Sequence, residues 1–293
     1  MKKSIVCILG LTLLFAMVAV AQDNPTLTFK FTKDNVPGAT ATEPGGINNA
    51  GVSVGLYTDS SGTQHGYILN GKKVTTLDDP NAAAGTTGGS NLNPNGAVSV
   101  VGSYTSAKTG ESVGFLYKGG KYTDIPGPKG AVATFGSAIN DSGSIVGYYT
   151  DSSKVTHGFL LKGGKYKTLN VPKALDTYAT GINKSGEIVF FWIDSAGAYE
   201  SSLYNGKTYK TINIPGVPNS LSLDINAAGD VCYQWIDSAG ANHGALLHAG
   251  KYYKFDYPSA AGTYGGGIND KSNIIGGYQA TSGGPFNAFK ATY

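Results

Sequence analysis

Four aspartates and three histidines recur in this sequence at a fixed spacing that could support chemistry. The aspartates open four similar turns, at Asp59, Asp151, Asp194 and Asp237. Three of them are followed six residues later by a histidine, at His65, His157 and His243. A carboxylate beside an imidazole can bind a metal ion or carry acid–base chemistry, but it can also hydrogen-bond across one hairpin and stabilise the turn. We favour the structural interpretation because the pairs repeat regularly, and we keep all seven as candidate ligand-binding residues.

The composition of these turns disfavours a metal centre. Each turn offers one carboxylate, whereas a calcium loop needs several closely packed oxygens. Structural zinc needs thiolates or clustered imidazoles, but Cys232 is the only cysteine after Cys7, and the histidines belong to alternate repeat units. We therefore assign no metal, no cofactor and no catalytic residue, and leave open whether the protein is an enzyme.

Two tryptophans, Trp192 and Trp235, begin identical Trp-Ile-Asp-Ser-Ala-Gly-Ala segments. An indole beside an open loop region can stack on the flat apolar face of a sugar ring, so both are candidate ligand-binding residues. The alternative is that each indole fills room created where Phe190 and Tyr233 replace the glycine of other units.

All these residues belong to one repeated unit. An Ile-Asn or Leu-Asn pair that closes a strand recurs at a regular interval in six places, at Asn48, Asn93, Asn140, Asn183, Asn226 and Asn269. The intervals are 45, 47, 43, 43 and 43 residues, and each unit contains four short strand signals bounded by turn residues. In the third unit these signals lie at 134–140, 144–150, 157–161 and 165–171. Four strands in about 40–45 residues are typical of a propeller blade.

Five of the six asparagines open an Asn-x-x-Gly sequence. This pattern predicts a type I turn closed by a left-handed glycine, with the asparagine side chain bonding nearby backbone. The last copy, which begins at Asn269, lacks the glycine. It predicts a looser turn with Asn273 left-handed instead.

The two ends of the mature chain complement each other. Residues 27–33 read as the fourth strand of a blade, and residues 286–293 read as a third strand. Pairing them would complete the sixth blade and cover two strand edges. The sequence therefore predicts an all-β fold over residues 22–293, a six-bladed β-propeller of four-stranded antiparallel blades closed by the amino-terminal strand.

Several segments resemble the HAF-type bacterial extracellular repeat, and together they cover essentially the whole mature chain. They include Gly181-Ile182-Asn183, Ile145-Val146-Gly147-Tyr148-Tyr149-Thr150-Asp151 and His157-Gly158-Phe159-Leu160. The His-Ala-Phe triplet that gives the repeat its name is degenerate here, as in His65-Gly66-Tyr67 and Asn287-Ala288-Phe289. The resemblance implies an exported repeat protein and brings no catalytic residues.

Charge and targeting signals narrow the range of partners. Residues 1–21 combine Lys2 and Lys3 with an apolar run and a small-residue cleavage site, which predicts a secretory signal and a secreted protein, extracellular or periplasmic. All 22 basic residues are lysine, and arginine is the residue that grips phosphate or carboxylate with two hydrogen bonds. We expect no nucleic-acid partner and no membrane insertion after cleavage.

The longer connections, from second to third and from fourth to first strand, all emerge on one rim, where recognition usually lies. We therefore predict a non-catalytic module that binds an extracellular glycan or protein through this loop-rich rim and the channel mouth. The alternatives are a secreted propeller hydrolase or lyase, and a structural matrix or envelope component, because propellers host all three classes.

Overall fold

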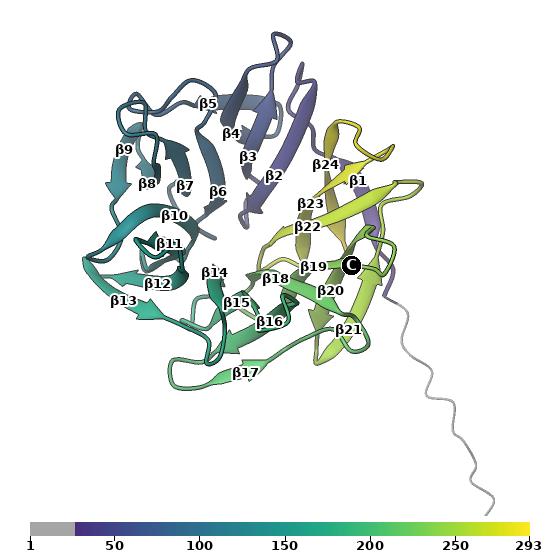
Figure 1. Cartoon of the computed structure of the whole chain (residues 1–293). Helices are drawn as coiled ribbons and strands as arrows, with labels where there is room; N and C mark the ends of the chain where they lie inside the picture. Colours follow the sequence, from purple (N-terminus) through teal and green to yellow (C-terminus); the bar gives the residue numbers. More distant parts are fainter. Residues whose placement is uncertain (1–26) are drawn as a thin grey trace, which may run out of the picture.

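The computed structural model describes residues 27–293, and the predicted signal sequence lies outside them. The described chain forms 24 β-strands in six four-stranded antiparallel sheets, arranged as a ring of blades (Figure 1). The prediction of an all-β, six-bladed propeller is confirmed. Within residues 27–293, no helix is long and apolar enough to span a membrane.

The first three blades follow the order predicted from the repeats. Blade 1 consists of β2 (Ala41–Ile47), β3 (Ser53–Thr58), β4 (Gln64–Asn70) and β5 (Lys73–Leu77). Blade 2 consists of β6 (Gly88–Leu92), β7 (Ser99–Thr105), β8 (Ser112–Lys118) and β9 (Lys121–Ile125). Blade 3 consists of β10 (Ala131–Ile139), β11 (Ile145–Asp151), β12 (Thr156–Lys162) and β13 (Lys165–Leu169).

The last three blades repeat this pattern, and the sixth takes its outer strand from the start of the chain. Blade 4 consists of β14 (Asp176–Ile182), β15 (Ile188–Ile193), β16 (Tyr199–Tyr204) and β17 (Tyr209–Thr211). Blade 5 consists of β18 (Asn219–Ile225), β19 (Val231–Ile236), β20 (Asn242–His248) and β21 (Lys251–Phe255). Blade 6 consists of β22 (Gly262–Ile268), β23 (Asn273–Gln279), β24 (Phe286–Thr292) and β1 (Lys30–Lys33).

Ring closure depends on the pairing of β1 with β24. The two strands run antiparallel, with Lys30 opposite Thr292 and Lys33 opposite Phe289. β1 is shorter than the predicted 27–33, but the residue before it, Phe29, still packs on Phe255 with ring centroids 4.8 Å apart. Phe31 lies edge-on to Phe289 at 5.3 Å. The amino-terminal segment therefore closes the ring with both backbone hydrogen bonds and aromatic packing.

The core lies between blades. At one position in each blade, where a residue of the second strand pairs with a residue of the third, only one of the two is aromatic. In four blades a glycine of the second strand faces an aromatic residue of the third, as Gly147 faces Phe159. In blades 4 and 5 the order is reversed, since Phe190 faces Ser202 and Tyr233 faces Ala245. A second ring would not fit, because a Cβ on Gly147 would lie 2.9 Å from the Phe159 ring. The small residues Ser202 and Ala245 on the third strand thus make room for the large rings of Phe190 and Tyr233 on the second.

The anchor asparagines shape the turns as predicted. Asn48 Oδ1 accepts the N–H groups of Ala50 and Val52, both at 3.0 Å, and Gly51 is left-handed with φ 78°. The prediction of a left-handed Asn273 in the last copy is wrong, because Ser272 occupies the left-handed position with φ 60°. Asn269 Oδ1 still accepts the N–H groups of Lys271 and Asn273, at 3.0 and 2.9 Å. A serine can adopt this conformation at some energetic cost, so the turn keeps its geometry without glycine.

These asparagines also tie neighbouring blades together, which sequence reasoning did not predict. The side-chain amide of one anchor donates to the main-chain carbonyl of the next, from Asn140 to Asn183, Asn183 to Asn226, Asn226 to Asn269 and Asn269 to Asn48, at 3.1, 3.3, 3.2 and 2.8 Å. The last of these bonds crosses the point where the ring closes. All four asparagine donors are buried.

Candidate functional site

The Asp–His pairs lie in the loop-rich rim and hold its hairpins together. His65 Nε2 is 3.5 Å from Asp59 Oδ2, and the corresponding distances are 3.2 Å for His157 and Asp151 and 3.4 Å for His243 and Asp237. The other carboxylate oxygen of Asp59 accepts the backbone N–H groups of Ser61 and Thr63. The predicted hydrogen bond across the hairpin is therefore present for His157 and His243, and His65 lies within ion-pair distance of Asp59.

Each histidine also reaches the next crossover through Nδ1. His65 contacts Asp78 and His243 contacts Asp256, at 3.0 and 2.9 Å. Hydrogen bonds from Ser61 and Thr63 lower the pKa of Asp59 to about 2, so this carboxylate stays ionised. Within residues 27–293, no three or more His, Cys, Asp or Glu side chains are grouped to hold a metal ion.

The fourth aspartate turn has no histidine. Asp194 Oδ1 accepts the N–H groups of Ala196 and Ala198, at 2.8 and 2.9 Å, as in the other turns. Glu200 takes the position of the histidine and contacts Asn213. The structure thus gives all seven candidates a structural contact, and their role in ligand binding stays a prediction.

Both tryptophans lie half-buried between blades, already engaged by the protein. Trp192 Nε1 donates to the Ser202 hydroxyl at 3.0 Å. Ser202 is the small residue that pairs with Phe190, so the Trp192 indole is held by the same exchange of residues. Trp235 stacks on His243 with ring centroids 4.2 Å apart and carries Lys254 Nζ 4.1 Å from its ring. Little of the Trp235 ring is left for a sugar, and binding at either indole stays a prediction.

The sequence also contains two Gly-x-Ser-x-Gly matches, at residues 51–55 and 110–114. Ser53 begins β3, where it is buried and donates to Asp34 Oδ2 at 2.7 Å. Ser112 begins β8 in an antiparallel blade, where it pairs with Thr105. A nucleophile elbow instead needs a sharp strand-to-helix turn that exposes the serine. Neither match therefore has hydrolase geometry.

A β-bulge in the first strand of every blade turns one residue toward the channel. The strand register shifts between Pro44 and Gly46 in blade 1 and at the equivalent position in the other five blades. Bulges re-aim side chains in this way. The residue after the bulge is glycine or alanine in four blades, but it is Asn91 in blade 2 and Asp224 in blade 5.

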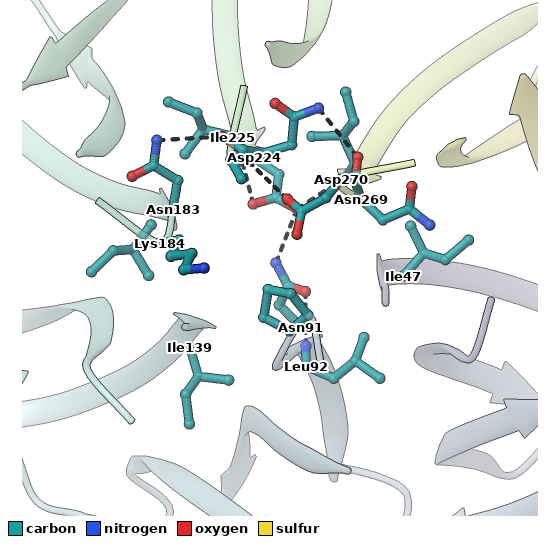
Figure 2. Close-up of a pocket in the computed structure, with 15 residues that line it drawn as sticks. Ile47, Asn91, Leu92, Ile139, Asn183, Lys184, Asp224, Ile225, Asn269 and Asp270 are labelled. Carbon is teal, nitrogen blue, oxygen red and sulfur yellow. Dashed lines mark hydrogen bonds between the residues drawn. The ribbon is translucent and has the colours of Figure 1, made fainter. Parts of the chain in front are cut away.

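Asn91 and Asp224 meet across the channel because blades 2 and 5 are opposite in a six-membered ring (Figure 2). Asn91 Nδ2 donates to Asp224 Oδ2 at 3.2 Å. The same carboxylate accepts the backbone N–H groups of Ile225 at 2.9 Å and Ile268 at 3.1 Å. The glycine at this position in blade 1 is required, because a Cβ on Gly46 would overlap the Asn91 side chain.

This bridge divides the channel into two unequal parts. On the side of the asparagine turns a cavity of about 20 Å³ remains, which has room for about one water molecule. The apolar residues that precede the anchors line it: Ile47, Leu92, Ile139, Ile182, Ile225 and Ile268. On the loop-rich side, Asn91 and Asp224 form the floor of an open cup of about 340 Å³.

The floor carboxylate titrates unusually. Asp224 is only 6% exposed, and this burial raises the pKa of Asp224 to about 7, because the ionised form loses contact with water. The three hydrogen bonds oppose this change without cancelling it. Perturbed carboxyl groups inside a cavity are characteristic of functional sites, although structural networks produce them too.

The wall of the cup is polar on some blades and aromatic on others. Hydroxyl and amide groups come from Ser90, Ser137, Thr180 and Gln234. Asp224 is the one charged residue in the lining. The cup therefore offers hydrogen-bonding groups without any positive charge.

Five half-buried aromatic rings run in one series across blades 3 and 4 at this mouth. Phe135 stacks on Tyr148 at 4.6 Å, Tyr148 meets Tyr178 edge-on at 5.0 Å, and Tyr178 stacks on Phe191 at 4.4 Å. Tyr199 continues the series, 6.1 Å from Phe191. We call these five residues the aromatic ladder. Leu56, Ser103 and Gln234 occupy the Tyr148 and Phe191 position in other blades, so the ladder breaks the sixfold repeat.

Comparison with known proteins supports the fold alone. No protein-family model matches the chain, and no curated protein sequence matches it. Among solved structures, the chain is similar to AofleA from Arthrobotrys oligospora, with 13% identity and a TM-score of 0.54 over 86% of this chain and 83% of that one.

Two further structures share this architecture. TolB from Acinetobacter baumannii is 14% identical with a TM-score of 0.53, over 82% of this chain and 63% of that one. The β-propeller domain of the Trilobed protease from Pyrococcus furiosus is 11% identical with a TM-score of 0.50, over 86% and 95%. That domain is described as having an open velcro topology, whereas β1 pairs with β24 here.

Proposed function

We propose that this protein is an exported, non-catalytic module that binds a neutral saccharide in the cup at the loop-rich mouth of its channel. The observation that carries the proposal is the aromatic ladder beside a hydroxyl- and amide-lined cup. Sugar rings present a flat apolar face that stacks on aromatic rings and a rim of hydroxyls that need hydrogen bonds. Export rests on the predicted signal sequence.

The charge and size of the cup support this class of ligand. With Asp224 at its floor and no lysine in its lining, the cup repels anionic groups above neutral pH. Its volume of about 340 Å³ lies at the lower end of the roughly 300–1000 Å³ typical of small-molecule sites. A short saccharide end fits better than a folded protein surface.

A glycan array probed with the mature protein and with Tyr148→Ala/Phe191→Ala tests the proposal. Neutral glycans should bind the parent protein, and the double variant should lose about tenfold or more, because each stacked ring contributes on the order of 1 kcal/mol. Tyr117→Ala is the control, since Tyr117 packs on Tyr122, and neither residue lines the cup. Equal binding by parent and double variant would refute this site.

The rim tryptophans provide the competing site. If the glycan instead stacks on Trp192 and Trp235, the double alanine variant at those positions should lose binding while the ladder variant keeps it. A protein that binds no glycan but forms concentration-dependent oligomers in sizing experiments would favour the matrix alternative.

One observation favours the enzymatic alternative, namely the pKa of about 7 at Asp224. A carboxyl group that titrates near neutral pH can serve as a general acid. However, both its oxygens already accept hydrogen bonds, which suits a bridge better than a proton donor. Saccharide hydrolysis by the parent protein that disappears in Asp224→Asn would support the enzyme.

A further inference from the structure

A second pocket opens on the opposite face of the ring, between blades 3 and 4. It has a volume of about 260 Å³ and lies beside the asparagine turns of these two blades. Three lysines line it: Lys162 and Lys167 from blade 3, and Lys184 from the turn of blade 4. None of its lining residues is acidic. The pocket lining is therefore positively charged, although the whole chain has a formal net charge of only +3.

Carboxylates near these lysines are already engaged elsewhere. Asp141, in the blade 3 turn, accepts the backbone and side-chain N–H groups of Asn95, both at 2.8 Å. Glu187, in the blade 4 turn, accepts the side chains of Asn183 and Ser185. At the closing blades, by contrast, Lys290 forms an ion pair with Asp34 at 2.9 Å. The pocket lysines have no carboxylate within ion-pair distance in the described part of the chain.

Hydrogen bonds fix the position of one lysine and of two hydroxyl groups in the pocket. Lys167 Nζ donates to the Tyr204 hydroxyl at 2.9 Å, and that hydroxyl donates to the Gly206 carbonyl at 2.7 Å. The lysine head is thereby held toward blade 4. At the base, Ser142 donates to Asn140 Oδ1 at 2.7 Å, so the buried Ser144 hydroxyl, 3.1 Å away, donates to the Ser142 oxygen.

The charge is specific to this pair of blades. Lys184 follows an anchor asparagine directly, and that position holds Asn49, Pro94, Asp141, Ala227 and Asp270 in the other blades. Lys167 faces Leu160, and the residues in its place are Thr75, Thr123, Lys210, Tyr253 and Thr32. A structural role in the repeat would not require lysine at these two positions.

We propose that this pocket binds a tetrahedral oxyanion, a sulfate or phosphate ester carried on a small group such as a single sugar. Three ammonium groups supply both the charge and the hydrogen-bond donors. Lysine serves here as a point charge, so the absence of arginine does not exclude the site. The pocket is distinct from the cup and does not depend on the function proposed there.

Isothermal titration of the mature protein with glucose 6-sulfate, glucose 6-phosphate and glucose tests the proposal at about 20 mM salt, where the charges are weakly screened. At least one ester should bind and glucose should not, and comparing the two esters identifies the anion. In Lys162→Gln/Lys167→Gln/Lys184→Gln we expect about tenfold or greater loss of affinity.

The control variant Lys73→Gln/Lys118→Gln/Lys251→Gln removes the same charge from exposed lysines of blades 1, 2 and 5 and should bind like the parent. Lys118 occupies in blade 2 the position of Lys162 in blade 3. Tyr204→Phe keeps every charge and should weaken binding a few-fold by releasing Lys167. Equal loss in both triple variants, or failure of both esters to bind the parent protein, would overturn the proposal. Lysine side-chain NMR shifts at the three positions give an independent readout.

Discussion

The bridge between Asn91 and Asp224 makes a quantitative prediction about pH and stability. A rise in pKa from an ordinary 3.8 to about 7 at Asp224 corresponds to about 4 kcal/mol. Between about pH 4 and pH 7 only the unfolded chain releases this proton, so this group makes the folded protein less stable as pH rises through that window. Below about pH 4 the Asp224 carboxyl is protonated in both the folded and the unfolded chain, and above about pH 7 it is ionised in both.

Asp224→Asn removes this titration while keeping the shape of the side chain. The stability of the parent protein relative to the variant should fall by about 2.5 kcal/mol between pH 5 and pH 8. Guanidinium unfolding of both proteins at several pH values, followed by tryptophan fluorescence, measures the difference. Other titrating groups are common to both proteins and cancel if they are independent of Asp224.

A stability difference that stays constant from pH 5 to pH 8, or one that changes with the opposite sign, would refute a raised pKa at Asp224. Asp59→Asn is the control, because the pKa of Asp59 is lowered to about 2. Its effect should be lost as pH falls from about 4 toward 2, and it should favour the parent protein at neutral pH. A carboxyl NMR titration with a midpoint near 7 would confirm the assignment to Asp224 directly.

Three further predictions concern the scaffold. Phe31→Ala should lower the unfolding free energy by about 2 kcal/mol, since the ring packs on Phe289 where the chain closes; an unchanged calorimetric melting temperature would contradict closure through β1. Ser272→Gly should stabilise by up to about 1 kcal/mol, and Gly51→Ser should destabilise by a similar amount, because both residues are left-handed; denaturant unfolding that gives the reverse order would contradict the turn assignment. Asn269→Ala should cost about 1 kcal/mol more than Asn48→Ala, because Asn269 also donates to the next blade; equal losses in chemical denaturation would mean that this inter-blade bond adds nothing.

The blades were predictable because their signals are local and repeated six times. Strand periodicity, the asparagine turns and the complementary ends of the chain gave the number of blades and their closure. The Asp–His contacts were predictable for the same reason, since each pair belongs to a single hairpin. Even the one turn that was mispredicted differs only in whether Ser272 or Asn273 takes the left-handed position.

The channel and its mouth could not be predicted, because they depend on residues far apart in the sequence. Asn91 and Asp224 are 133 positions apart and meet only after the ring closes. A signal was nevertheless present, since both replace glycine or alanine at one position of the repeat. The aromatic ladder has a similar signal, because its rings appear at positions that are not aromatic in most other blades.

The position of the bridge has an evolutionary consequence. Tandem-repeat genes gain and lose units easily, and the near-identical segments at Trp192 and Trp235 suit such a history. A carboxylate and an amide that face each other across the hole are three units apart, which places them diametrically opposite only when the total is six. Insertion or loss of one unit would leave Asp224 buried with fewer partners, so this single contact fixes the copy number of an otherwise expandable architecture.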